Sequence, residues 1–262
     1  MNRRFTIIKE KILSNTNLYI RVVLAFTFLG HGLVSLGFSP SITLHENLIE
    51  SVNIFNVSSV YLLNIQAYFD IIISFLLMIN FRIKQVIYIV LIYLFFVSIS
   101  ALSYYSSATG SIFGIAECFR RFPWILFALF IISDLNKNPK YHYIRIGLSF
   151  AFIAHGFASL GFLGLNQGHI DLASNIVSSE NAREFITYTG ISDTIIGLML
   201  LQSIYTKWIS FIGLIWISFI VYLSYLTAFP DAIFRTGFLL ASIYVFLDKK
   251  TYLPKLINYE KI

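Results

Sequence analysis

Charged residues and cysteine are both scarce in this chain of 262 residues. Only 12% of the residues are charged and 57% are hydrophobic, whereas a soluble domain carries about twice that charged fraction. The scarcity of charge, together with a mean hydropathy of +0.76, excludes an ordinary soluble domain. No polar stretch is long enough to form a separate soluble domain beside the apolar part.

The chain has one cysteine, Cys118, so an internal disulfide and a paired-cysteine redox relay are both excluded. A Glu-x-x-His pair and a cluster of cysteine and histidine are also missing from the sequence. These are the usual ligand patterns of di-metal and zinc sites, and the sequence therefore predicts no metal centre.

Apolar runs of about 20 residues recur along the whole chain, which is the length that a helix needs to cross a bilayer. The spans must be helical because lipid cannot satisfy free backbone groups. The sequence therefore predicts an all-α, polytopic membrane protein with the lipid bilayer as its surroundings. The eight expected spans are 18–38, 58–80, 84–105, 112–134, 143–164, 184–204, 207–228 and 232–248.

The net charge of +6 reflects where the basic residues lie and does not indicate a nucleic-acid partner. Lysine and arginine precede the first span, follow the even-numbered spans and fill the C-terminal tail. All of these places fall on one side if the spans alternate, and the opposite loops are mainly acidic, with Arg183 as the clear exception. The positive-inside rule then predicts a multi-pass protein of the cytoplasmic (inner) membrane with both termini in the cytoplasm.

One segment occurs twice in the chain. YIRVVLAFTFLGHGLVSLGF ends at Phe38, and YIRIGLSFAFIAHGFASLGF ends at Phe162. The similarity continues in later spans, where FDIIISFLLM resembles SDTIIGLMLL and ECFRRFPW resembles DAIFRTGF. Because each half has an even number of spans, both halves enter the membrane from the same side. The sequence predicts two parallel four-helix repeats, residues 1–136 and 137–262.

Ionisable residues recur at corresponding places in the two repeats. His31 and Ser35 are four residues apart and share a helix face, and Asp70 falls near the middle of the next span. Charged groups inside a membrane usually face a bundle interior or a wet cavity, so we expect a polar pocket in each repeat that opens away from the cytoplasm. The candidate catalytic residues are His31, His155, Asp70 and Asp193, and the candidate ligand-binding residues are Arg21, Ser35, Glu117, Arg121, Arg145, Ser159, Asp231 and Arg235.

Each of these groups also has a structural interpretation. Arg21 and Arg145 could simply extend to the cytoplasmic surface. The acid–arginine pairs that begin the last span of each half could be structural ion pairs, and the histidines and aspartates could only hydrogen-bond within the bundle. A haem iron held between His31 and His155 is a further alternative, which the polar neighbours of each histidine within its own half disfavour.

The order of these motifs resembles the DoxX/DoxD-like membrane family, whose unit has four transmembrane helices. The family carries an arginine and an HG-x-x-K-L-like motif in its first helix and an acidic residue before a glycine-containing run in its second. This chain departs from the pattern by a serine in place of the lysine, by aspartate in place of glutamate, and by the fusion of two units. The matching residues are Arg21, His31, Gly32, Leu36 and Asp70, and again Arg145, His155, Gly156, Leu160 and Asp193.

The resemblance implies a function linked to redox enzymes, since some family members are membrane subunits of thiosulfate:quinone oxidoreductase. We therefore expect a redox-linked or small-ligand-binding subunit, with a quinone as the candidate cofactor and a soluble or membrane oxidoreductase as the candidate partner. The missing lysine argues against an anionic substrate such as thiosulfate. The alternatives are a proton- or ion-coupled small-molecule transporter and a non-catalytic scaffold or assembly subunit.

Overall fold

The computed structural model describes residues 3–39, 42, 45–46, 49–50, 57–107, 115, 118–133, 140–161, 170, 173–174, 176–248 and 251. Helices dominate this part of the chain, and it contains no strand. The helices in chain order are α1 (Arg3–Ser14), α2 (Thr16–Leu33) with its π-helical continuation η1 (Val34–Phe38), α4 (Ser59–Ile79), α5 (Ile83–Ser107), α7 (Phe122–Ile132), α8 (Lys140–Ser159), α10 (Ser179–Leu201), α11 (Thr206–Thr227) and α12 (Phe229–Leu247).

Each of the eight predicted spans overlaps one of these helices, and six of the helices are long and apolar enough to cross a membrane. The protein is therefore a multi-pass membrane protein whose outer helices contact the bilayer. The six membrane-length segments are Thr16–Phe38, Ser59–Ile79, Ile83–Leu102, Ser179–Leu201, Thr206–Leu226 and Phe229–Leu247.

Two of the predicted spans differ from these six. Helix α7 has only 11 residues and begins beside Pro123, which suits the first turn of a helix because proline lacks a backbone N–H. Helix α8 has 20 residues but is not one of the six, and it carries Lys140, His142, Arg145 and His155. An additional amphipathic helix, α1, precedes the first span.

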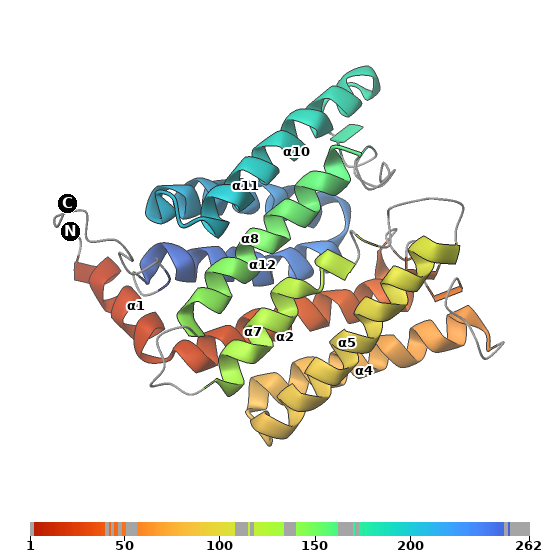
Figure 1. Ribbon diagram of the computed structural model, residues 1–262, viewed down its shortest axis with the longest axis horizontal. Helices are drawn as coiled ribbons and strands as arrows, with labels where there is room; N and C mark the ends of the chain where they lie inside the picture. Colours follow the sequence, from red (N-terminus) through yellow and green to blue (C-terminus); the bar gives the residue numbers. More distant parts are fainter. Residues whose placement is uncertain are drawn as a thin grey trace, which may run out of the picture.

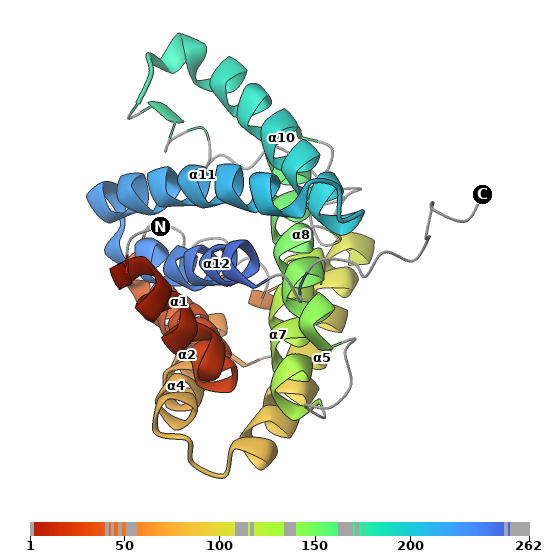
Figure 2. The ribbon, with the colours of Figure 1, turned by 90° about the vertical axis from the view of Figure 1, so that its left-hand side faces the viewer.

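Helices from both halves of the chain mix in two layers (Figures 1 and 2). In one layer, neighbouring helices follow the order α4, α2, α12 and α11, and in the other they follow the order α10, α8, α7 and α5. The first and second helices of each half pack together, whereas the last helix of each half packs against the first helix of the other half. This packing joins helices from residues 1–136 to helices from residues 137–262. The division of the chain into two repeats at this boundary stays a prediction.

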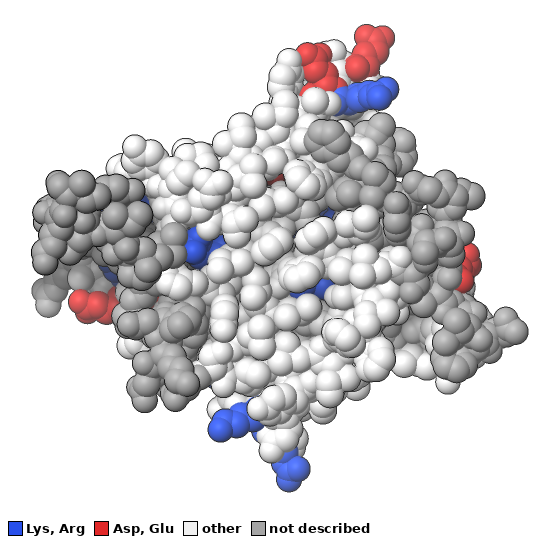
Figure 3. Space-filling model, in the orientation of Figure 1, with Lys and Arg blue, Asp and Glu red and all other residues white. Residues whose placement is uncertain are grey.

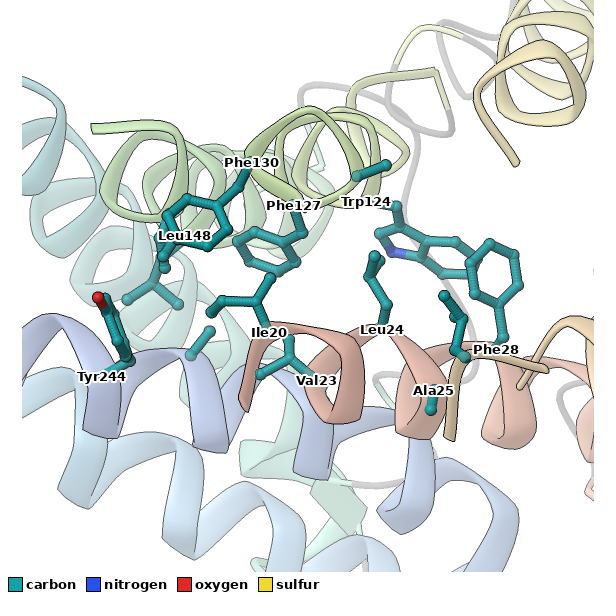
Figure 4. Close-up of a cluster of buried hydrophobic side chains, with 14 of the residues drawn as sticks. Ile20, Val23, Leu24, Ala25, Phe28, Trp124, Phe127, Phe130, Leu148 and Tyr244 are labelled. Atoms are coloured by element: carbon teal, nitrogen blue, oxygen red, sulfur yellow. The ribbon is translucent and has the colours of Figure 1, made fainter. Parts of the chain in front are cut away.

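The core lies where the two layers meet (Figure 4). Aromatic side chains of α7 point from one layer toward α2 in the other, and α8 and α12 contribute further side chains beside them. The principal residues of this cluster are Ile20, Leu24, Phe28, Trp124, Phe127, Phe130, Leu148 and Tyr244. Helix α2, the first predicted span, is therefore buried by helices that come much later in the sequence.

The outward faces of α4, α5, α10 and α11 are strongly apolar. Large hydrophobic side chains such as Phe75, Phe96, Ile195 and Ile215 are exposed on them. Figure 3 shows an almost uncharged face whose visible lysine, arginine, aspartate and glutamate side chains lie mainly toward its edges. A bilayer provides the apolar contacts that such faces need.

Candidate functional site

Each half places a histidine beside the aspartate of the following helix. Nδ1 of His31 on α2 lies 2.7 Å from Oδ2 of Asp70 on α4. Nδ1 of His155 on α8 lies 2.6 Å from Oδ2 of Asp193 on α10. The four residues that the sequence marks as candidate catalytic groups thus form two matched pairs, and their catalytic role stays a prediction.

Both aspartates are buried, with side-chain exposures of 0% for Asp70 and 2% for Asp193. The histidine side chains differ, since His31 is 9% exposed and His155 is 32% exposed. A buried carboxylate needs compensating hydrogen bonds, and the imidazole supplies one in each half. An ionised carboxylate only accepts hydrogen bonds, so Nδ1 then carries the proton and Nε2 becomes the nitrogen that can exchange a proton elsewhere.

The glycine after each histidine brings the two helices into contact. A Cβ atom on Gly32 would lie 2.9 Å from the carbonyl oxygen of Ala67 on α4. A Cβ atom on Gly156 would lie 2.8 Å from the carbonyl oxygen of Gly190 on α10. Small residues allow such close approach of membrane helices. The histidine reaches the aspartate of the next helix because the backbones meet at this glycine.

The end of the repeated motif terminates its helix in both halves. Gly37 and Gly161 have positive φ angles of 87° and 76°, a conformation that favours glycine over other residues. Before Gly37 the helix widens into the π-helical turn η1, a feature that is often found at functional sites. The motif therefore positions its histidine one or two turns before a defined helix end.

Ser35 and Ser159, the two motif serines predicted as ligand-binding residues, are both buried. The Ser35 hydroxyl lies 2.9 Å from Nδ1 of His45. The His45 ring in turn packs against the ring of His31, with 4.5 Å between the centroids. His45 is thus a neighbour of the first pair, although the sequence indicates only an outer-loop position for it.

The third helix of each half supplies an aromatic side chain next to the aspartate. Trp216 on α11 donates a hydrogen bond from Nε1 to Oδ1 of Asp193 at 2.7 Å. The hydroxyl of Tyr93 on α5 acts on the Asp70 carboxyl as a hydrogen-bond donor, although Oδ1 of that carboxyl has no partner at full hydrogen-bond geometry. Sequence reasoning missed both residues. A signal was available, because LIY ends at Tyr93 and LIW ends at Trp216, each at the same interval after its aspartate.

Two residues near the start of α7 complete the surroundings of the first pair. Arg121 is buried, and its charge acts on Asp70. The indole of Trp124 stands edge-on to the His31 ring, with 5.3 Å between the centroids and an interplanar angle of 89°. Trp124 was also missed from the sequence, whereas Arg121 was expected there. Glu117, its predicted partner, lies outside the described residues.

The predicted acid–arginine pair of the second half connects several helices. Asp231 accepts a hydrogen bond from Ser39, which follows η1 of the first half. Arg235 donates to Ser224 on α11, and its charge interacts with Asp231 and with Arg120 of the first half. These contacts tie α12 to the first half of the chain as well as to α11.

The arginine of each motif is buried rather than extended to the surface. Arg145 donates from Nη1 to the carbonyl oxygens of Leu200 and, at 2.8 Å, Leu201 at the C-terminal end of α10, and from Nε to Thr251 at 2.8 Å. A cation suits this end of a helix because the last carbonyl groups are unsatisfied and carry partial negative charge. Arg21 is its counterpart in α2, and its Nη1 has no hydrogen-bond partner.

Among the described residues, no group of three or more histidine, cysteine, aspartate or glutamate side chains could hold a metal ion. Comparisons of the chain with protein-family models, with curated proteins and with solved structures found no match. The class that the described fold defines is that of a helical, multi-pass membrane protein with two His–Asp pairs whose aspartates are buried.

Proposed function

We propose that this protein is a tandem DoxX-like membrane protein of eight spans that binds a quinone-like molecule at a buried His–Asp site. The observation that carries the proposal is the pairing of His31 with Asp70, which recurs as the pairing of His155 with Asp193. We also propose the inner membrane as its location, with both termini in the cytoplasm, as the distribution of basic residues indicates.

The chemistry of a His–Asp pair suits the proton transfers of a quinone. Reduction of a quinone to a hydroquinone takes two electrons and two protons, and each proton is bound by a carbonyl oxygen. A histidine can deliver or remove such a proton, while its aspartate orients the ring and stabilises the imidazolium form. The electrons would come from an oxidoreductase partner, as the resemblance to the DoxX/DoxD-like family implies.

Aromatic side chains around His31 offer apolar contacts of the kind that flat ligands use. Trp124 packs against Phe28 of α2 with 5.0 Å between ring centroids, and against Phe234 of α12 with 5.7 Å. Small-ligand sites typically combine such apolar walls with a few polar groups. Here the polar groups are the His–Asp pair and Arg121.

The test is mass spectrometry of small molecules extracted from the purified full-length protein. We expect a co-purifying quinone in the wild type and its loss in the double variant His31→Gln/His155→Gln. His142→Gln is the matched control, because His142 also lies on α8 but its ring lies 3.3 Å from the backbone carbonyl oxygen of Thr251, away from both His–Asp pairs. Absence of any quinone from the wild type, or equal amounts in the double variant, contradicts the proposal.

Proton-coupled transport is the second candidate, and the burial of both aspartates in membrane-length helices favours it. Carboxylate–histidine chains in membranes commonly act as proton relays. Substrate uptake by proteoliposomes that disappears with Asp70→Asn and Asp193→Asn would support this function over quinone binding. Stable association with a soluble oxidoreductase that is unaffected by His31→Ala would instead indicate a scaffold.

A further inference from the structure

The two His–Asp pairs differ in how completely their polar atoms are satisfied. Both carboxylate oxygens of Asp193 have partners, with Oδ2 bonded to His155 and Oδ1 bonded to Trp216. In the first half Oδ2 of Asp70 is bonded to His31, and the Tyr93 hydroxyl on α5 acts on the same carboxyl, but Oδ1 is buried without a partner at full hydrogen-bond geometry. Nε1 of Trp124 is likewise buried without a partner.

These two unsatisfied atoms belong to residues that contact one imidazole. Asp70 is hydrogen-bonded to His31, and the Trp124 ring packs edge-on against the same ring. Asp70 is 0% exposed and Trp124 is 4% exposed, so neither residue is open to bulk solvent. An unpaired buried polar atom destabilises the folded protein, and native proteins retain few of them without a reason. Two beside one histidine point to a polar ligand at this place.

The two atoms also specify the chemistry of that ligand. Oδ1 of an ionised Asp70 needs a hydrogen-bond donor, and the Trp124 indole N–H needs an acceptor. A hydroxyl group offers both, whereas a quinone carbonyl oxygen only accepts. An aromatic hydroxyl adds a flat ring that suits the neighbouring Phe28 and Phe234 side chains, which already pack against Trp124.

We infer that the first His–Asp pair is a binding site for a phenolic hydroxyl, as on a hydroquinone, and that the second pair is a closed copy. In the closed copy, Trp216 supplies to Asp193 the donor that the ligand supplies to Asp70. The greater exposure of His155 does not reverse this assignment, because Asp193 has no oxygen left without a partner. The inference rests on the proposed quinone-binding function and adds which half binds and which redox form is preferred.

Equilibrium binding to the full-length protein in lipid nanodiscs tests the inference. The probes are a decyl-substituted benzohydroquinone, kept reduced under nitrogen, and the corresponding decyl benzoquinone. We expect the wild type to bind the hydroquinone at least fivefold more tightly than the quinone. Trp124→Phe removes the N–H and keeps the aromatic ring, and it should weaken hydroquinone binding at least fivefold. Trp208→Phe is the matched control, because Trp208 is exposed on the outer face of α11.

Thermal stability without ligand gives an independent measure for the same variants. Trp216→Phe should lower the melting temperature, because Oδ1 of Asp193 loses its donor. Trp124→Phe should leave it unchanged or raise it, because an unsatisfied donor is removed. An equal decrease in both variants means that Trp124 is bonded to a bound water only, and that result overturns the inference.

The outcomes separate the inference from the proposed function. If the wild type binds neither probe, the proposed quinone-binding function fails and the inference fails with it. If the wild type binds the hydroquinone but Trp216→Phe weakens binding as much as Trp124→Phe, the function stands and the assignment to the first half is wrong. Equal affinity of the wild type for the two redox forms overturns the preference for the hydroxyl.

Discussion

The hydroxyl of Ser74 on α4 donates a hydrogen bond to the carbonyl oxygen of Ala25 on α2 at 2.8 Å. The corresponding junction of the second half joins Ser149 on α8 to the carbonyl oxygen of Gly197 on α10 at 2.7 Å. The donor serine therefore lies on the second helix in the first half and on the first helix in the second half. The two halves thus conserve the bond between these helices even where the residues that make it are exchanged.

This exchange predicts a rescue by a second substitution. Ser74→Gly should destabilise the protein by about 1–2 kcal/mol, because one hydrogen bond is lost and glycine disfavours a helix. Adding Ala25→Ser should recover at least half of that loss, because the donor is then placed as in the second half. The measurement is the free energy of unfolding in detergent, with Ser218→Ala as the control, since Ser218 is exposed and bonds only to its own helix. A double variant that is no more stable than Ser74→Gly contradicts the predicted equivalence of the halves.

Gly32→Ala should separate α2 from α4. A Cβ atom there would press against the Ala67 carbonyl oxygen at 2.9 Å, a backbone atom that cannot move aside independently. We expect a loss of about 1–3 kcal/mol in stability together with weaker ligand binding, because the His31–Asp70 distance increases. Thermal unfolding and ligand titration measure the two effects.

Gly213→Ala is the control for this prediction. Its Cβ atom would meet the far end of the Phe152 ring at 3.0 Å, and a side chain can shift. A smaller destabilisation and unchanged binding are expected there. If both alanine variants behave alike, the close approach at Gly32 is not what sets the geometry of the pair.

Arg145→Ala should loosen the end of α10 and the segment around Thr251 together, because one guanidinium bonds to both. Hydrogen bonds that involve a charged group contribute about 1.5–3 kcal/mol each, so we expect a loss of at least 3 kcal/mol. Faster hydrogen exchange at the C-terminal turn of α10 and near Thr251 is the local readout. Arg145→Lys should restore only part of the stability, because an ammonium lacks the fork of donors.

Arg183→Ala provides the comparison for Arg145→Ala, since Arg183 is exposed on α10. It should change stability by less than about 0.5 kcal/mol, as exposed substitutions usually do. Unchanged hydrogen exchange in Arg145→Ala would mean that the carbonyl groups find other partners without the arginine.

The proposed orientation predicts opposite labelling of two exposed positions. In a Cys118→Ser background, Arg183→Cys should react with a membrane-impermeant maleimide added outside intact cells. Arg82→Cys, in the turn between α4 and α5, should react only after the membrane is permeabilised. Labelling of both from outside, or the reverse pattern, contradicts the placement of the termini in the cytoplasm.

The sequence predicts the histidine and the aspartate of each pair because polar residues stand out in apolar helices. It also predicts the positions of the helices, since the length and composition of each run are sufficient for that. Tyr93, Trp124 and Trp216 were missed because aromatic residues are frequent throughout these helices and carry no signal of their own. Only a comparison of the two halves at the same interval after each aspartate would have revealed Tyr93 and Trp216.

The exchange of helices between the halves was not predictable from the pattern. Hydrophobic periodicity tells which face of a helix is buried but not which helix covers it. The contact of Ser35 with His45 was not predictable for a similar reason, because His45 belongs to the segment after the helix. Arg145 was assigned to a ligand site, which stays a prediction; its bonds to backbone carbonyl groups at the end of α10 and at Thr251 were not foreseen.

Because α12 covers α2 and α7 covers α8, neither half of the chain encloses its own first helix. If residues 1–136 were expressed alone, the face of α2 that α12 covers would be exposed to lipid or to another protein chain. Two copies of such a fragment could form a domain-swapped dimer, in which the last helix of each copy covers α2 of the other. In the predicted tandem arrangement each half can change independently, whereas a substitution in a symmetric dimer would be present in both copies.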